Sequence, residues 1–80
     1  MNRIKCLIVD DEAIAQRIIE KYLNDLSDYE IVDTCLSALE AMKVLQEKEV
    51  DLMFLDIEMP KLKGLAFLKT LKNPPQVIIT

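Results

Sequence analysis

The chain has 80 residues, of which 51% are hydrophobic and 30% are charged, and its formal net charge is −4. This length fits one small domain, and the negative charge does not favour a nucleic-acid-binding or membrane-binding surface. The sequence contains no histidine, which excludes a Cys/His zinc site and acid–base catalysis by histidine. We expect neither a membrane span nor a signal peptide, because no apolar run is long enough.

The first predicted strand covers Lys5 to Val9, and three acids, Asp10, Asp11 and Glu12, follow it at once. A mostly apolar run of this length is typical of a strand buried in a parallel sheet. A helix is expected from Ala13 to Leu26, since apolar residues recur there at helical spacing. The positions expected to form its apolar face are Ile14, Ile18, Ile19, Tyr22, Leu23 and Leu26.

The next two predicted elements are a polar strand and a capped helix. Residues Glu30 to Cys35 are expected to form the strand, and their polar composition favours the edge of the sheet. Ser37 and Glu40 match a capping box, in which the serine accepts from the amide three residues on and the glutamate reaches back. The helix that they open is expected to end near Lys48. Its predicted buried stripe is Ala38, Ala41, Met42 and Leu45.

The third predicted strand, Val50 to Leu55, ends in an acid, Asp56, as the first strand also does. A turn is expected after it, because Pro60 cannot donate a backbone hydrogen bond and disfavours helix at the residue before it. A third helix is expected from Gly64 to Lys72, stopped by the two prolines that follow. The last predicted strand is Gln76 to Thr80.

The alternation of strands and helices predicts an α/β fold with a parallel sheet, in the order βαβαβαβ. In such a sheet the carboxyl ends of neighbouring strands lie about 5 Å apart and face the ligand-binding crevice. If the first and third strands are neighbours, Asp10, Asp11 and Asp56 crowd at one place. Like charges at this range oppose folding unless a cation neutralises them. The pattern therefore favours a hard divalent ion at this edge of the sheet.

Three stretches of the chain together resemble the receiver domain of bacterial two-component response regulators, the CheY-like family. They are Leu7-Ile8-Val9-Asp10-Asp11-Glu12, Leu55-Asp56-Ile57-Glu58-Met59-Pro60 with Gly64 after it, and Val77-Ile78-Ile79-Thr80. The resemblance covers residues 1–80 and implies a single flavodoxin-like receiver domain with strand order 2-1-3-4. It also implies that the last helix, strand and helix of the family have no counterpart here.

The resemblance implies a role for each of five residues. Asp56 would be the phosphoacceptor and would take its phosphoryl group from a sensor histidine kinase. Asp10 and Asp11 would bind Mg²⁺ together with Asp56 and the backbone carbonyl of Glu58. Thr80 would contact a phosphoryl oxygen and act as the switch. Such a protein is a cytoplasmic phosphoacceptor rather than a turnover enzyme, and the chemistry fits, since a carboxylate can form an acyl phosphate.

The output of the predicted module lies outside these residues. Residues Lys61 to Pro75 resemble receivers attached to LytTR DNA-binding domains, which implies transcriptional control through a missing C-terminal domain. The fourth strand, with Val77 to Ile79 at its centre, is expected to be an exposed apolar edge. Edges of this kind pair with other chains, so self-association is predicted as well.

Other interpretations of the same residues stay open. Asp10 and Asp11 also suit the start of a helix, Asp56 a turn, Glu58 an exposed loop and Thr80 an ordinary strand position. The acids after the third strand loosely resemble Mg²⁺-dependent phosphatases of the haloacid-dehalogenase type, in which Asp56 would be the nucleophile. A third alternative is a receiver-like module that is not phosphorylated and serves only in protein interaction.

Overall fold

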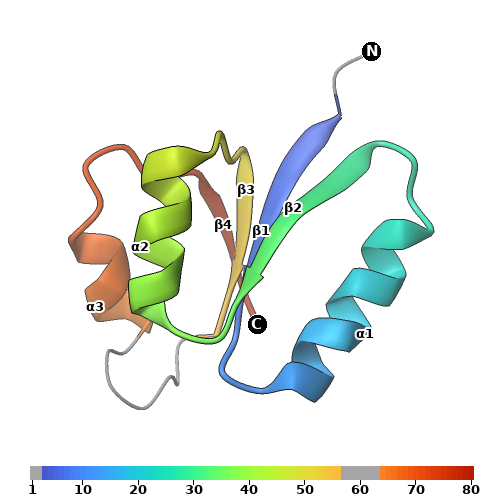
Figure 1. The fold of residues 1–80 in the computed structure, drawn as a ribbon, viewed down its shortest axis with the longest axis horizontal. Helices are drawn as coiled ribbons and strands as arrows, with labels where there is room; N and C mark the ends of the chain where they lie inside the picture. The colour runs from blue at the N-terminus through green and yellow to red at the C-terminus, as the bar shows by residue number, and fades with distance from the viewer. Residues whose placement is uncertain (1–2, 57–63) are drawn as a thin grey trace.

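The computed structural model describes residues 3–56 and 64–80 and has the predicted alternation of strands and helices (Figure 1). The elements are β1 (Ile4–Val9), α1 (Ala13–Asn24), β2 (Tyr29–Cys35), α2 (Ala38–Glu47), β3 (Leu52–Leu55), α3 (Gly64–Lys69) and β4 (Gln76–Ile79). The four strands form one parallel sheet in the order β2-β1-β3-β4. The predicted flavodoxin-like order 2-1-3-4 is confirmed, and the polar strand β2 lies at an edge.

The helices cover both faces of the sheet, with α1 on one side and α2 and α3 on the other (Figure 1). Alternate residues of a strand point to opposite faces, so β1 serves two cores. Leu7 and Val9 belong to the core beneath α2 and α3, whereas Cys6 and Ile8 belong to the core beneath α1. None of the helices in the described part of the chain is long and apolar enough to cross a membrane.

The central pair, β1 and β3, determines where the candidate site lies. The two strands are parallel neighbours, and Val9 is paired with Leu55. The last four residues of β1 are fully buried, and so is Leu55, as expected for strands covered on both faces. Because the strands end side by side, the residues that follow them, Asp10 and Asp56, lie at the same end of the sheet, beyond the C-terminal ends of the strands.

The capping box predicted at the start of α2 is present. The Ser37 hydroxyl accepts a hydrogen bond from the Glu40 N–H at 3.2 Å. The Glu40 carboxylate reaches back and accepts from the Ser37 hydroxyl at 3.2 Å and from the Leu36 N–H at 3.3 Å. The glutamate thus bonds to the amide one residue earlier than the motif predicts. The start of the predicted stripe is confirmed, since Ala38 and Ala41 are buried.

The apolar face predicted for α1 is wrong in part. The helix ends at Asn24, before Leu26. Four of the six predicted positions are exposed, namely Ile14, Ile18, Tyr22 and Leu26, at 72, 55, 71 and 49%. The other two predicted positions, Ile19 and Leu23, do pack on the sheet, and Gln16, which was not predicted, lies beside them. The helix is therefore rotated about its axis relative to the prediction, and the hydrogen bonds of Gln16, described below, account for this orientation.

Two other elements are shorter than predicted. The helix α3 ends at Lys69 rather than at Lys72, because Thr70 closes the last turn. The Thr70 N–H and hydroxyl both donate to the Phe67 carbonyl, at 3.0 and 2.7 Å, and bonds to the third residue back tighten and end a helix. The strand β3 begins at Leu52, later than the sequence indicated.

Replacing the capping serine tests how much the box contributes to stability. Ser37→Ala removes the acceptor of the Glu40 N–H and is expected to lower the free energy of unfolding by about 1 kcal/mol. Urea denaturation followed by circular dichroism measures this difference. Ser27→Ala, in the exposed loop before β2, is the matched control and should change the free energy by less than about 0.5 kcal/mol. Equal losses in both variants would contradict the capping role.

Candidate functional site

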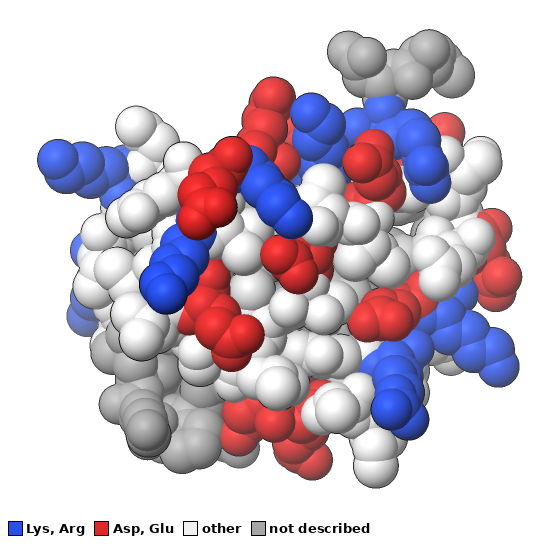
Figure 2. Space-filling model, in the orientation of Figure 1, with Lys and Arg blue, Asp and Glu red and all other residues white. Residues whose placement is uncertain are grey.

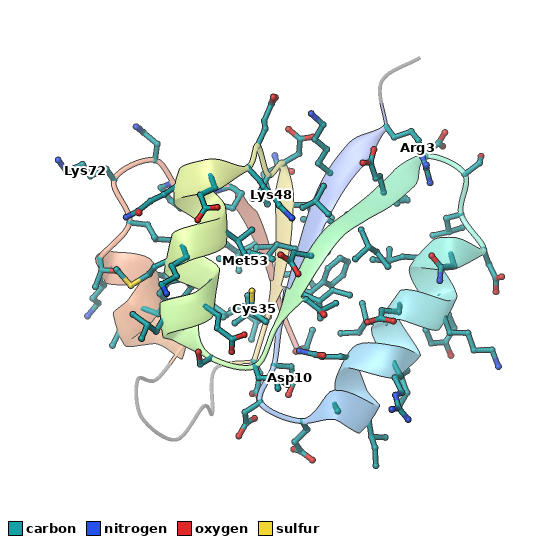
Figure 3. The ribbon with its side chains drawn as sticks, in the orientation of Figure 1. Arg3, Asp10, Cys35, Lys48, Met53 and Lys72 are labelled. Carbon is teal, nitrogen blue, oxygen red and sulfur yellow. The ribbon has the colours of Figure 1, made fainter. Side chains whose placement is uncertain are left out.

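Three carboxylates converge at the C-terminal end of the central strands β1 and β3. Asp10, Asp11 and Asp56 each offer one oxygen, and these oxygens all lie within 4.8 Å of one another. Asp10 is only 5% exposed, whereas Asp56 is half-buried and Asp11 is exposed. Figure 3 labels Asp10 at the lower end of the sheet, and Figure 2 shows acidic side chains gathered at that end. The structure thus brings together the three acids that the strand pattern placed at one edge.

Backbone hydrogen bonds tie two of these acids to the sheet. The Asp10 N–H donates to the Cys35 carbonyl of β2, and the Asp56 N–H donates to the Val9 carbonyl of β1, both at 3.0 Å. Oδ1 of Asp10 accepts from the Glu12 N–H at 2.9 Å. Glu12 precedes α1, and its own side chain makes no capping bond. Asp10 therefore shapes the turn into α1 and also faces the other two acids.

The electrostatics of the cluster oppose the charged form of Asp10. Burial raises the pKa of the Asp10 carboxyl, and the negative charges of Asp56, Asp11 and Glu12 raise this pKa further. The hydrogen bond from the Glu12 N–H acts in the opposite direction and lowers it. A cation among the three aspartates would relieve the repulsion. The residues fit Mg²⁺, because carboxylate oxygens are the protein ligands that this ion prefers.

Thr80 follows β4 and lies at the same end of the sheet as the three aspartates. Its N–H donates to the Leu55 carbonyl at 3.0 Å. A hollow of about 360 Å³ opens between this residue, the acids and α1, and the residues that line it are Asp10, Glu12, Ala15, Ile18, Ile19, Asp56 and Thr80. Four of the five predicted site residues therefore lie at one end of the sheet. The fifth, Glu58, lies outside the described residues.

One residue at this edge was missed by the sequence analysis. Gln16 of α1 is only 7% exposed. Its amide nitrogen Nε2 donates to the Asp10 carbonyl at 3.0 Å and to the Cys35 carbonyl at 2.7 Å. Buried polar side chains are normally hydrogen-bonded in this way. Its spacing was the available signal, because Gln16 lies three residues before Ile19 and seven before Leu23, on the stripe of α1 that faces the sheet.

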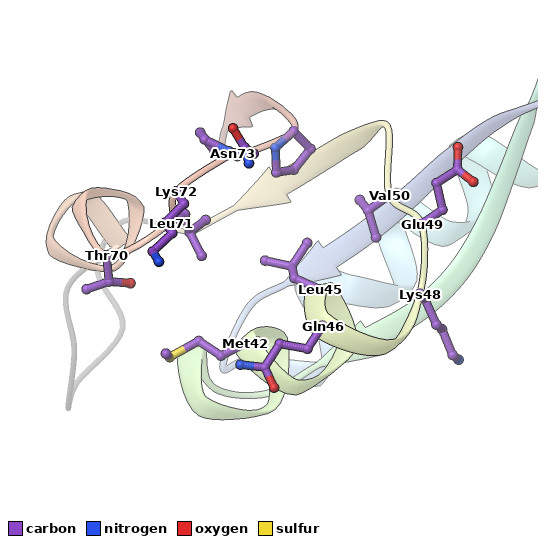
Figure 4. Close-up of a pocket in the computed structure, with 12 residues that line it drawn as sticks. Met42, Leu45, Gln46, Lys48, Glu49, Val50, Thr70, Leu71, Lys72 and Asn73 are labelled. Atoms are coloured by element: carbon purple, nitrogen blue, oxygen red, sulfur yellow. The ribbon is translucent and has the colours of Figure 1, made fainter.

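A second cavity, of about 510 Å³, lies at the opposite end of the sheet, where β3 and β4 begin (Figure 4). It lies between the C-terminal half of α2 and the connection from α3 to β4. Figure 4 shows Met42, Leu45 and Leu71 among its lining side chains. Its lining contains a single carboxylate, that of Glu49. This cavity therefore lacks the ligand set that a hard divalent ion requires.

Known proteins are similar to this chain in sequence and fold. Residues 6–80 match the family described as response regulator receiver domain. The transcriptional regulatory protein BtsR of Escherichia coli is 44% identical over 62 residues, which make up 78% of this chain and 26% of that protein. The chain spans about a quarter of the length of the curated relatives that it matches.

Two solved structures are similar to the whole sheet. The response regulator domain of Thermotoga maritima CheB superposes with a TM-score of 0.89 at 32% identity, over 98% of this chain and 60% of that one. The MaeR response regulator bound to beryllium trifluoride superposes with a TM-score of 0.90 at 28% identity, over 96% of this chain and 66% of that one.

Removing the buried charge of Asp10 should stabilise the metal-free protein. Asp10→Asn keeps an oxygen that can accept from the Glu12 N–H, and we expect it to raise the free energy of unfolding at neutral pH by about 1 kcal/mol in EDTA. The advantage should vanish below the ordinary aspartate pKa of 3.8, where the wild-type carboxyl is protonated in both states. Urea denaturation at several pH values measures it.

The matched control for this charge removal is Asp28→Asn, in the exposed loop between α1 and β2. It should alter the free energy of unfolding by no more than about 0.5 kcal/mol. A loss of stability in Asp10→Asn at neutral pH in EDTA would show that the three carboxylates do not repel one another strongly in the folded protein.

Proposed function

The chain belongs to the response regulator receiver domain family, and on that premise we propose that Asp56 accepts a phosphoryl group from a sensor histidine kinase. One observation carries the proposal: oxygens of Asp10, Asp11 and Asp56 lie within 4.8 Å of one another where β1 and β3 end. A signalling phosphoacceptor needs a nucleophilic carboxylate next to a site that neutralises phosphoryl charge. The likeness to a response regulator bound to beryllium trifluoride supports this assignment.

The proposed transfer places different demands on each residue. A carboxylate oxygen of Asp56 attacks phosphorus, the bond from phosphorus to the kinase histidine nitrogen breaks, and an acyl phosphate forms. Asp10 and Asp11 would hold Mg²⁺ with Asp56, and the backbone carbonyl of Glu58 would be a further ligand. When bound, the ion supplies positive charge that offsets the repulsion between the carboxylate and the phosphoryl oxygens. Thr80, which lines the 360 Å³ hollow together with Asp10 and Asp56, would donate a hydrogen bond from its hydroxyl to a phosphoryl oxygen.

We propose a transcriptional output for the same signal. The relative BtsR is named a transcriptional regulatory protein, and the segment from Lys61 to Pro75 resembles LytTR-type regulators. Contact with DNA is assigned to a separate output domain, because the net charge of −4 over the 80 residues disfavours binding to phosphates. In this proposal the phosphorylated receiver controls that domain and does not itself turn over a substrate.

Phosphorylation is tested with a small phosphodonor. Incubation of the chain with acetyl phosphate and Mg²⁺ should add the mass of one phosphoryl group, measured by intact mass spectrometry. Asp56→Asn should show no gain, because an amide does not form an acyl phosphate. EDTA should abolish the gain in the wild type, since the phosphoryl charge is then not neutralised.

The matched control for this experiment is Asp28→Asn, which lies far along the chain from the three acids and should gain mass as the wild type does. Loss of the gain in both variants would point to a general effect on folding. No gain in the folded wild type, with Mg²⁺ present, would contradict the proposed function.

We also propose that the chain self-associates through β4. Within the described ranges, β4 pairs only with β3 and forms one edge of the sheet. Ile78 and Ile79 on this strand are 44 and 46% exposed. An open groove beside it is lined by Ile4, Leu52 and Ile78 among others. An apolar edge strand with free backbone groups favours pairing with a second copy of the chain.

Sedimentation velocity tests this association over a range of protein concentrations. The wild type should form dimers or larger species as the concentration rises. Ile78→Lys should weaken the association about tenfold or more, since a charged side chain on an edge strand opposes pairing. Leu39→Lys, at an exposed position of α2 (67%), is the control and should associate as the wild type does. A monomeric wild type at all concentrations would exclude the proposal.

A further inference from the structure

Gln16 and Asp10 are the two buried polar residues in the described part of the chain. Gln16 projects from the first turns of α1 and is 7% exposed. Its Nε2 donates at 3.0 Å to the Asp10 carbonyl, which follows β1, and at 2.7 Å to the Cys35 carbonyl, the last of β2. One side-chain amide thus joins a helix to the ends of two strands.

The chemistry of these contacts identifies which end of the amide faces the strands. Carbonyl oxygens only accept hydrogen bonds, so the NH₂ group of Gln16, with its two protons, must face both of them. The Cys35 carbonyl also accepts from the Asp10 N–H at 3.0 Å. Asp10 is therefore held at its N–H by Cys35, at its carbonyl by Gln16 and at its carboxylate by the Glu12 N–H.

The carbonyl that Gln16 holds belongs to the peptide unit between Asp10 and Asp11. A peptide unit is planar, so fixing the direction of its C=O also fixes the direction of the N–H and Cα of the next residue. The orientation of this one unit determines where the side chains of Asp10 and Asp11 start. Both carboxylates must reach within 4.8 Å of Asp56 for the cluster to exist.

We propose that Gln16 is a positioning residue for the cation site: through the Asp10–Asp11 peptide it aims both carboxylates at Asp56. This inference rests on the proposed function, since it presupposes that the three aspartates bind Mg²⁺. Gln16 itself contributes no oxygen to the ion in this assignment. When a residue that orients metal ligands through hydrogen bonds, without contacting the metal, is substituted, metal affinity typically falls by about 10-fold to 100-fold.

The test is the affinity for Mg²⁺ alone, measured by isothermal titration calorimetry on the 80-residue chain at neutral pH. Gln16→Met keeps the length of the side chain and removes both donors, and we expect Mg²⁺ to bind about 10-fold more weakly. Gln46→Met makes the same replacement at an exposed position of α2 and should bind as the wild type does. Circular dichroism is used to check that each variant is folded under the conditions of the titration. In a folded variant, a weaker dissociation constant then reports on the Mg²⁺ site and not on unfolding.

A second readout uses the wild type and does not depend on whether the Gln16 variant folds. In ¹⁵N-edited NMR spectra, the side-chain NH₂ signals of Gln16 should shift during a Mg²⁺ titration with the same midpoint as the backbone N–H signals of Asp10 and Asp56. The Gln46 side-chain signals should not move. Gln16 signals that stay unchanged while Asp10 and Asp56 saturate would overturn the inference.

The outcomes separate this inference from the proposed function. If the wild type and Gln46→Met bind no Mg²⁺, the proposed metal site fails and the positioning role fails with it. If the wild type binds Mg²⁺ and folded Gln16→Met binds it equally well, the site stands and Gln16 serves only the packing of α1. Weaker binding in Gln16→Met alone supports the positioning role.

Discussion

The parallel pairing of β1 with β3 is the constraint on which the rest of the structure depends. It places Val9 beside Leu55, and the chain leaves both strands at the same edge. The acidic cluster depends on this arrangement, because Asp10 and Asp11 continue from one strand and Asp56 from the other. A shift of one residue in this pairing would exchange the faces of the sheet and break both cores as well as the acidic cluster.

The cluster of Asp10, Asp11 and Asp56 lowers the stability of the fold, whereas the apolar strands beside it raise that stability. The interior of β1 and β3 is wholly apolar and fully buried at Leu7, Ile8, Val9 and Leu55, and hydrophobic burial there stabilises the fold. The next residue after β1, Asp10, is almost as buried as these apolar residues, and its carboxyl group lies close to those of Asp11 and Asp56. Arrangements that cost stability in this way are typical of functional sites. The rigid apolar strands hold the acids together despite their repulsion.

The helix α1 shows how a polar contact decides the orientation of an amphipathic element. Two stripes on this helix compete for the sheet, one through Ile14, Ile18 and Tyr22 and the other through Gln16, Ile19 and Leu23. The second stripe packs on the sheet although it contains the polar residue. Gln16 donates there to the Asp10 carbonyl and also to the Cys35 carbonyl, which accepts from the Asp10 N–H as well. A buried carbonyl without a hydrogen-bond partner costs free energy. The more apolar stripe is left exposed in the described part of the chain.

The sequence by itself determined the order of the elements, the parallel sheet, the capping of α2 and the convergence of Asp10, Asp11 and Asp56. These features follow from local patterns, namely apolar runs, helical spacing, cap residues and an acid at each strand end, and each depends on few neighbours. The side of α1 that packs on the sheet and the burial of Gln16 were decided only in the tertiary structure. They depend on contacts with other elements, such as the hydrogen bond to the Cys35 carbonyl of β2. The spacing of Gln16 with Ile19 and Leu23 placed these residues on one stripe, but a local pattern does not reveal which carbonyl groups the folded chain brings to that stripe.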